Sequence, residues 1–350
     1  MRILAATTVR NEGPYLLEWI AWHRLLGVTD FLFHSNDCDD GSDRLLDLLA
    51  EHGVIRHETH QPPPDKSVQW SALRAAWRHD LRKSTDWMLI SDLDEFPVIH
   101  VGEGRFADLM AALPEGCDAV ALPWRLFGSN AQIEISGRPV TQEFTRSTPA
   151  VMHHPIAATF FKSLFRPAAF RAQGVHRPRH RPETEPVWAD GSGRPLAGLI
   201  AGNDKRLSLI STRDYRRLVE LHHYSLRSAQ GFIVKSDRGL PNRTNKPIDL
   251  SYWVARNFNT EENTSAVRLG PRLNEEISTL MALPGVAELH QAALDWHRAR
   301  FDELVLTPEG FDLYAHILLA QDSAVMPMAL LQNSRREGYT SRIHAVRGAT

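Results

Sequence analysis

The chain has 350 residues, of which 43% are hydrophobic and 23% charged, and its formal net charge at neutral pH is -2. This balance is close to that of globular proteins, and it excludes a largely disordered chain and speaks against a nucleic-acid-binding protein, which carries a marked basic excess. The sequence has no apolar run near the roughly 18 residues of a membrane span, and residues 1–9 lack the length of a signal peptide, so we expect a cytoplasmic protein, with peripheral membrane contact left open.

The first 125 residues alternate between short apolar segments and longer amphipathic ones. We expect strands at residues 3–9, 31–33, 54–55, 87–90 and 119–123. Between them we expect helices at residues 14–25, 42–49, 67–82 and 106–113. Alternation at this spacing predicts an α/β fold whose mostly parallel sheet is covered on both faces. Ligands bind such sheets outside the carboxyl ends of their strands, which indicates where the functional site lies.

The regular pattern fades after about residue 124. Residues 125–230 are rich in histidine, arginine and proline, and they predict loops over a rigid sheet. Helices are expected again at residues 272–283, 285–305 and 308–320. We therefore divide the chain into a first domain, residues 1–235, and a mainly helical C-terminal extension, residues 236–350, whose role the sequence does not define.

The clearest chemical signal is Asp92-Leu93-Asp94, directly after the apolar segment 87–90. Residues two apart in a strand point the same way, so Asp92 and Asp94 are expected to share a face at the carboxyl edge of the sheet. Two carboxylates placed there repel each other unless a cation lies between them. A hard divalent ion, with phosphate oxygens completing its coordination, is the natural partner, and a solvated acidic loop is the alternative.

Two further polar clusters also follow predicted strands, namely Val9-Arg10-Asn11-Glu12 and residues 36–42. All three clusters fall at the carboxyl edge of one parallel sheet. Together they resemble the family 2 glycosyltransferases of the GT-A fold, in particular the bacterial branch related to family 92. The resemblance covers about residues 1–230 and is carried by segments 11–19, 36–42, 92–96, 122–129, 162–163, 174–178 and 221–224.

The resemblance implies a GT-A fold, with a Rossmann-like, mostly parallel central sheet, flanking helices and the C-terminal helical extension. It implies a metal-dependent, inverting transferase of the hexosyltransferase type, with Mn²⁺ or Mg²⁺ as cofactor. The donor would be a nucleotide diphosphate sugar and the acceptor a carbohydrate or glycan-lipid. A UDP-sugar is expected, although Ser35 stands where the family often has an aspartate that reads the pyrimidine base.

Carried over position by position, the resemblance implies two sets of site residues. The donor would be contacted by Val9, Arg10, Asn11, Glu12, Asn36, Asp40, Gln69, Asp92, Lys162 and His176. The metal would be held by Asp94, the central residue of catalysis, together with Asp92 and either His222 or His223, since only one of these neighbours can point into the cleft. Local roles stay open for several of them, such as helix capping by Asp40 and core packing by the histidines.

Inverting transfer also requires a carboxylate that deprotonates the acceptor hydroxyl. Glu143 matches an acidic position of the family pattern and is our first candidate for this catalytic base. Asp190 and Glu95 are the alternates.

Three other functions stay open at this point. A nucleotidyltransferase normally has a Gly-rich basic loop after its first strand, which Arg10-Asn11-Glu12 fits poorly. A nucleotide-sugar hydrolase would release free sugar without an acceptor. The third is a non-catalytic binding module that resembles a glycosyltransferase, and the intact pair Asp92 and Asp94 counts against it.

Overall fold

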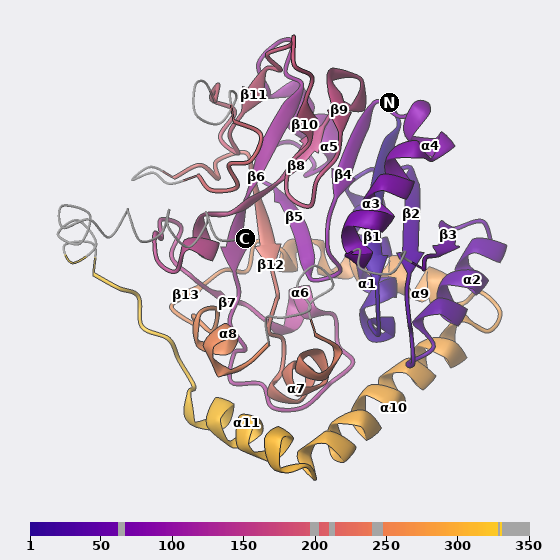
Figure 1. Cartoon of the computed structure of the whole chain (residues 1–350), viewed down its shortest axis with the longest axis vertical. Helices are drawn as coiled ribbons and strands as arrows, with labels where there is room; N and C mark the ends of the chain where they lie inside the picture. Colours follow the sequence, from indigo (N-terminus) through magenta and orange to yellow (C-terminus); the bar gives the residue numbers. More distant parts are fainter. Residues whose placement is uncertain (62–66, 197–202, 210–213, 240–247, 328–329, 331–350) are drawn as a thin grey trace.

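A nine-stranded mixed sheet forms the centre of the protein (Figure 1). The structure is a computed structural model that describes residues 1–61, 67–196, 203–209, 214–239, 248–327 and 330. Within the extension expected at 236–350, residues 240–247, 328–329 and 331–350 lie outside this description. The strands of the sheet are β1 (Ile3–Val9), β2 (Asp30–Ser35), β3 (Arg56–Thr59), β4 (Trp87–Ile90), β5 (Glu95–Ile99), β6 (Ala119–Leu126), β8 (Phe161–Phe165), β11 (Trp188–Ala189) and β12 (Val219–His223).

The strand order is β3-β2-β1-β4-β8-β6-β12-β5, and β11 pairs with β6. Strands β8 and β5 run antiparallel to their neighbours, and the others share one direction. This mostly parallel, Rossmann-like sheet with flanking helices confirms the expected α/β class. Two short ribbons lie outside it, β7 (Arg146–Ser147) with β13 (Glu261–Glu262) and β9 (Phe170–Ala172) with β10 (Arg179–His180).

The apolar strands are buried on both faces. In β1, Ile3 and Ala5 pack into one core cluster, while Leu4 and Ala6 pack into a second cluster on the opposite face. Side chains alternate between the faces of a strand, so a strand covered on both sides needs apolar residues at every position. This requirement explains the apolar run at residues 3–6 with which the predicted strand begins.

Eleven helices are found among the described residues. They are α1 (Gly13–Leu25), α2 (Ser42–Glu51), α3 (Val68–Arg78), α4 (Asp80–Lys83), α5 (Phe106–Ala111), α6 (Val140–Glu143), α7 (Ala229–Arg238), α8 (Leu250–Val254), α9 (Gly270–Met281), α10 (Val286–Val305) and α11 (Pro308–Leu319), with three short 3₁₀ turns, η1 (Ile156–Thr159), η2 (Pro167–Ala169) and η3 (Val267–Leu269). The single helix expected at 67–82 is two helices. His79 is extended there and its ring accepts a hydrogen bond from the backbone N–H of Leu81, which starts α4.

The helices of the C-terminal extension pack on the first half of the chain. Leu273 and Leu280 of α9 and Val286 of α10 belong to the same core cluster as the buried face of α1. Gly13, the first residue of α1, lies so close to α10 that an added Cβ would come within 2.5 Å of the Cβ of Ala293. Glycine is therefore required at this position for α10 to seat against α1. Among the described residues, no helix has both the length and the apolar character needed to cross a membrane.

Candidate functional site

The Asp92-Leu93-Asp94 segment forms a tight turn between β4 and β5. The backbone N–H of Glu95 donates to the carbonyl oxygen of Asp92 at 3.1 Å, which closes the turn. The extended geometry that we expected for the two aspartates is therefore wrong, because β4 ends at Ile90. The turn directs Asp92 and Asp94 to different partners on different elements.

Asp92 lies between α3 and β8. Its Oδ2 is 2.9 Å from Nζ of Lys162, and its Oδ1 accepts a hydrogen bond from Nε2 of Gln69 at 3.3 Å. Burial opposes the charge of Lys162, but the carboxylates of Asp92 and Glu95 outweigh it and raise the lysine pKa. The Lys162 side chain is fully buried, whereas that of Asp92 is 39% exposed. Three residues predicted to contact the donor thus meet at one point, with Asp92 facing solvent.

Asp94 lies on the other side of the turn and is almost completely buried. Its Oδ2 is 2.7 Å from Nζ of Lys235 on α7, and its Oδ1 is 3.5 Å from Nε2 of His223 at the end of β12. Burial raises the pKa of Asp94, but the Lys235 ammonium and the His223 ring together bring it well below its usual range. Asp94 is therefore an anion at neutral pH, with a cation already beside it.

Glu12 extends this charged region toward the end of β1. Its Oε1 is 3.0 Å from Arg238 and 3.7 Å from Arg227. Arg238 also donates to the carbonyl oxygen of Arg10 at 2.9 Å. The guanidinium of Arg227 stacks over the ring of Tyr15 and donates to the carbonyl oxygen of Leu93 at 3.1 Å.

Side chains and backbone groups tie the ends of β1 and β2 together. The Asn11 backbone is in the left-handed region, with φ of 49°, and its side-chain oxygen accepts the N–H of Asp39 at 2.7 Å. Asn36 donates its backbone N–H to the carbonyl oxygen of Val9 at 3.1 Å and its side-chain amide to the carbonyl oxygen of His60. The Val9 side chain is packed in the core, so only its backbone reaches the edge.

Asp40 serves the fold around this edge. It is fully buried and accepts hydrogen bonds from the N–H groups of Gly13 and Ser42, at 2.9 and 2.8 Å. Nε2 of His297 on α10 lies 3.0 Å from Oδ2 of Asp40, the same oxygen that accepts the N–H of Gly13. Burial raises the pKa of Asp40, but the interactions with His297 and Ser42 lower it below its ordinary value. The structure thus places Asp40 as a link between α1, α2 and α10, with its oxygens engaged by the protein.

The neighbouring histidines of β12 point to opposite faces of the sheet. His223 faces Asp94, whereas His222 is 2.8 Å from Glu220 and so lies away from the aspartate turn. His176 lies near His223. The rings of both histidines pack on Trp124, at centroid distances of 5.3 and 4.2 Å. Burial and the nearby Lys162 lower the pKa of His176 to about 3, so its ring is neutral.

The three candidates for the catalytic base differ in accessibility. Glu143 is half-buried and accepts a hydrogen bond from the hydroxyl of Ser136 at 2.7 Å. Asp190 is buried in a turn and accepts bonds from two backbone N–H groups and from Arg194. Glu95 is fully buried beside Lys162, and burial together with the neighbouring aspartates raises its pKa.

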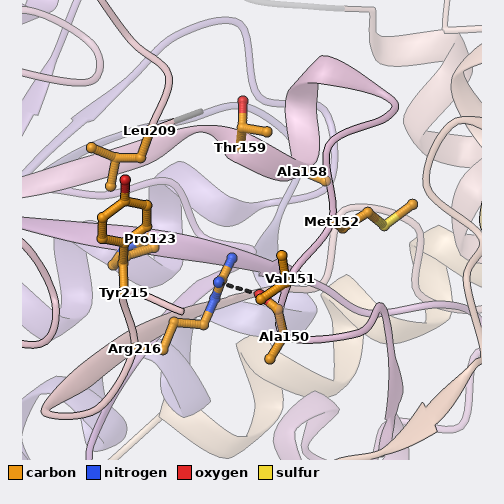
Figure 2. A pocket seen from close by; sticks show the side chains of 9 residues that line it. All are labelled: Pro123, Ala150, Val151, Met152, Ala158, Thr159, Leu209, Tyr215 and Arg216. Atoms are coloured by element: carbon orange, nitrogen blue, oxygen red, sulfur yellow. Dashed lines mark hydrogen bonds between the residues drawn. The ribbon is translucent and has the colours of Figure 1, made fainter. Parts of the chain in front are cut away.

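The described residues form two hollows of note. The first lies beside β6, and Figure 2 shows two of its lining residues, Arg216 and Ala150, joined by a hydrogen bond from the guanidinium to the carbonyl oxygen. Its lining residues include none of those predicted for the site. The second is lined in part by Tyr15, Glu143 and Arg227. Glu143 thus shares a hollow with the arginine that contacts the aspartate turn.

Sequence reasoning missed three cations of this site, namely Arg227, Lys235 and Arg238. They follow the His222-His223-Tyr224 segment, and two of them lie on α7, a helix that we had not predicted. The available signal was the presence of three basic residues, at 227, 235 and 238, in the segment that follows β12. That pattern is weak on its own, because surface helices commonly carry such residues.

Comparison with known proteins identifies relatives of this chain. The profile of the family described as "Glycosyltransferase family 92" matches residues 7–191, just over half of the chain. A family 92 glycosyltransferase of Oryza sativa subsp. japonica is 26% identical over 179 residues, which is 50% of this chain and 28% of that protein. A family 92 protein of Arabidopsis thaliana is 30% identical over 96 residues, 27% of this chain and 16% of that protein. The matched region therefore spans less than a third of these relatives.

Among solved structures, a mannosyltransferase from Pyrobaculum calidifontis in complex with GDP-Man and Mn²⁺ is 13% identical to this chain. The match covers 91% of this chain and 85% of the other, with a TM-score of 0.32.

Proposed function

Because the chain belongs to glycosyltransferase family 92, we propose that it transfers a sugar from a nucleotide diphosphate donor to an acceptor hydroxyl with inversion. A UDP-hexose is the expected donor, and a carbohydrate or glycan-lipid is the expected acceptor. A cytoplasmic location and a place in a bacterial branch of family 2 stay predictions, and peripheral membrane contact stays open.

The observation that carries this proposal is the set of partners around the aspartate turn. Gln69, Asp92 and Lys162 come from three separate elements and meet at the carboxyl edge of the sheet. Asp94 and His223 meet on the other side of the same turn. Ligands of parallel α/β sheets bind at this edge, so the arrangement suits a donor lying across the ends of β1 and β4.

The residues present fit a divalent ion that is completed by the donor. Among the described residues, no group of three or more histidine, cysteine, aspartate and glutamate side chains is placed to hold a metal. Asp94 and His223 supply two ligand atoms 3.5 Å apart, and Nδ1 of His223 is buried without a hydrogen-bond partner in the described structure. Mg²⁺-type sites commonly use one or two protein ligands with water and substrate phosphates, so Asp94 and His223 would hold Mn²⁺ or Mg²⁺ in the presence of a diphosphate. The ion would supply charge neutralisation for the leaving diphosphate.

The chain's own residues would perform the remaining steps. Lys162, Gln69 and Asp92 would orient the ribose and the donor sugar through hydrogen bonds. A carboxylate must take the proton from the attacking acceptor hydroxyl, and Glu143 stays our first candidate because it is half-buried and shares a hollow with Arg227.

The proposal is tested by a thermal-shift screen of UDP, GDP, ADP and CDP, each with and without Mn²⁺. Ligands that bind the native state raise its stability by mass action, so at least one diphosphate should raise the melting temperature. The matched nucleoside is the control and should have no effect. If no diphosphate shifts the melting temperature under either condition, the proposal fails. Release of free sugar from the donor in the absence of acceptor would favour the hydrolase instead.

A further inference from the structure

Three cations from one short segment of chain lie at the aspartate turn and at the adjoining end of β1. Arg227 directly precedes α7, which Ser228 caps, and Lys235 and Arg238 lie three residues apart in its last turn. Residues at this spacing share a face of a helix. Their side chains are only 8%, 10% and 12% exposed, respectively. A cation removed from water to this extent needs anionic partners to offset the cost of desolvation.

The protein supplies two carboxylates for these three cations. Lys235 pairs with Asp94 at 2.7 Å, and Arg238 pairs with Glu12 at 3.0 Å. Arg227 is 3.7 Å from Glu12, which Arg238 already engages more closely. Among the ion pairs of the described residues, Arg227 is thus the cation of this group that lacks a close carboxylate partner.

The two arginines also have unused hydrogen-bond donors. The Nε atoms of Arg227 and Arg238 are buried and have no hydrogen-bond partner in the part of the chain that the structure describes. Buried polar atoms of this kind usually have partners, and exceptions point to an absent ligand or water. Guanidinium groups match the geometry of phosphate oxygens, which they can engage with two hydrogen bonds at once.

From this geometry we propose that Arg227, Lys235 and Arg238 form the diphosphate-binding group of the donor site. Asp94 and Glu12 hold these cations in position until the donor arrives. This inference rests on the proposed function. It assigns the binding of the leaving diphosphate to residues that the sequence analysis did not predict for the site. When the bond between the anomeric carbon and the diphosphate oxygen breaks, the electron pair stays on that oxygen. The three cations stabilise the resulting charge while the acceptor oxygen bonds to the anomeric carbon and its proton passes to the base.

The test is a binding titration of the full-length chain with the best nucleoside diphosphate and with the matching monophosphate. Lys235→Gln and Arg238→Gln should each weaken diphosphate binding by about tenfold or more, as expected for lost hydrogen bonds to a charged group. Monophosphate binding should change much less, because the second phosphate is absent. Lys83→Gln, an exposed lysine paired with Asp80, is the matched control and should bind like the wild type.

The double variant Glu12→Gln/Arg238→Gln guards against misfolding, because it removes both members of the closest pair together, while Arg227 keeps its stacking on Tyr15 and its hydrogen bond to the carbonyl oxygen of Leu93. It too should lose diphosphate affinity while its melting temperature stays near that of the wild type. Unchanged diphosphate affinity in folded Lys235→Gln and in the double variant overturns this inference and leaves the transferase proposal standing. A wild-type chain that binds no diphosphate overturns both.

Discussion

At the scale of single residues, the site is a set of matched charges. Asp92 pairs with Lys162, Asp94 with Lys235, and Glu12 with Arg238, all within 3.0 Å. We had argued that two neighbouring carboxylates need a cation between them. The protein meets that need with fixed ammonium and guanidinium groups, and Lys162 also lies 3.3 Å from a second carboxylate, that of Glu95.

Asp94 is the residue whose replacement should be most harmful to activity. Asp94→Asn removes the charge that faces His223 and leaves Lys235 without its anion, so we expect turnover to fall by at least about a hundredfold. Donor turnover with product detection measures this, and Asp80→Asn, an exposed aspartate, is the control. Retained turnover in a folded Asp94→Asn chain would contradict the central role of this residue.

His23 should make stability depend on pH. Its ring is fully buried, its Nδ1 bonds to the carbonyl oxygen of Trp19, and burial lowers its pKa to about 3. In the unfolded chain this histidine takes up a proton below its ordinary pKa near 6.5, whereas in the folded chain it stays neutral until about pH 3. Stability is therefore lost as pH falls through this window, by up to about 1.4 kcal/mol per pH unit for this group.

Denaturant titrations between pH 7.5 and 5 measure this loss. His23→Gln should flatten the dependence, while His316→Gln, at an exposed position on α11, should leave it unchanged. An equally steep profile in His23→Gln would show that other groups cause the acid sensitivity.

At the scale of elements, the apolar strands of the first half were predictable and the elements that complete the site were not. Strand β4 is entirely apolar, and β1 and β6 each begin with an apolar run, because both faces of these strands are buried. Strand β8 was harder to predict, because Lys162 interrupts its apolar sequence. Its antiparallel pairing with β4 and β6 also depends on contacts between residues distant in sequence. The site residues at strand ends could be inferred from position and resemblance, whereas the partner of Asp94 lies 141 residues away on α7.

The link between α10 and the loop after β2 gives a prediction for an element contact. His297→Ala removes the hydrogen bond to the fully buried Asp40, and a buried carboxylate left without this partner should destabilise the fold by about 1–3 kcal/mol. Chemical denaturation measures the change. His316→Ala, on the exposed side of α11, is the control, and equal stability of the two variants would argue against the link.

At the scale of the whole molecule, the helical extension and the sheet share one core. Helix α9 and the start of α10 contribute Leu273, Leu280 and Val286 to the cluster that also holds the buried face of α1. The division at residue 235 stays a prediction, since it came from a change of sequence pattern, which does not reveal what the extension covers.

A chain that ends at residue 239 tests this division. It keeps every predicted site residue and all of α7, but it lacks α9 and α10. We expect it to lose cooperative thermal unfolding and diphosphate binding, because the buried face of α1 would be uncovered. Calorimetry alongside the full-length chain measures this. A sharp transition with retained ligand binding would show that residues 1–239 fold independently.

The matched charges have a consequence for how the two proposed ligands, the metal ion and the nucleotide, would depend on each other. A dication entering alone would add two positive charges to a region where each acidic group is already satisfied, and it would have to compete with the ammonium group beside Asp94. A nucleotide diphosphate brings the missing negative charge, so each ligand should tighten the binding of the other. By thermodynamic reciprocity, the factor by which Mn²⁺ tightens the nucleotide equals the factor by which the nucleotide tightens Mn²⁺. The supply of donor would then govern metal occupancy as strongly as the metal governs donor binding.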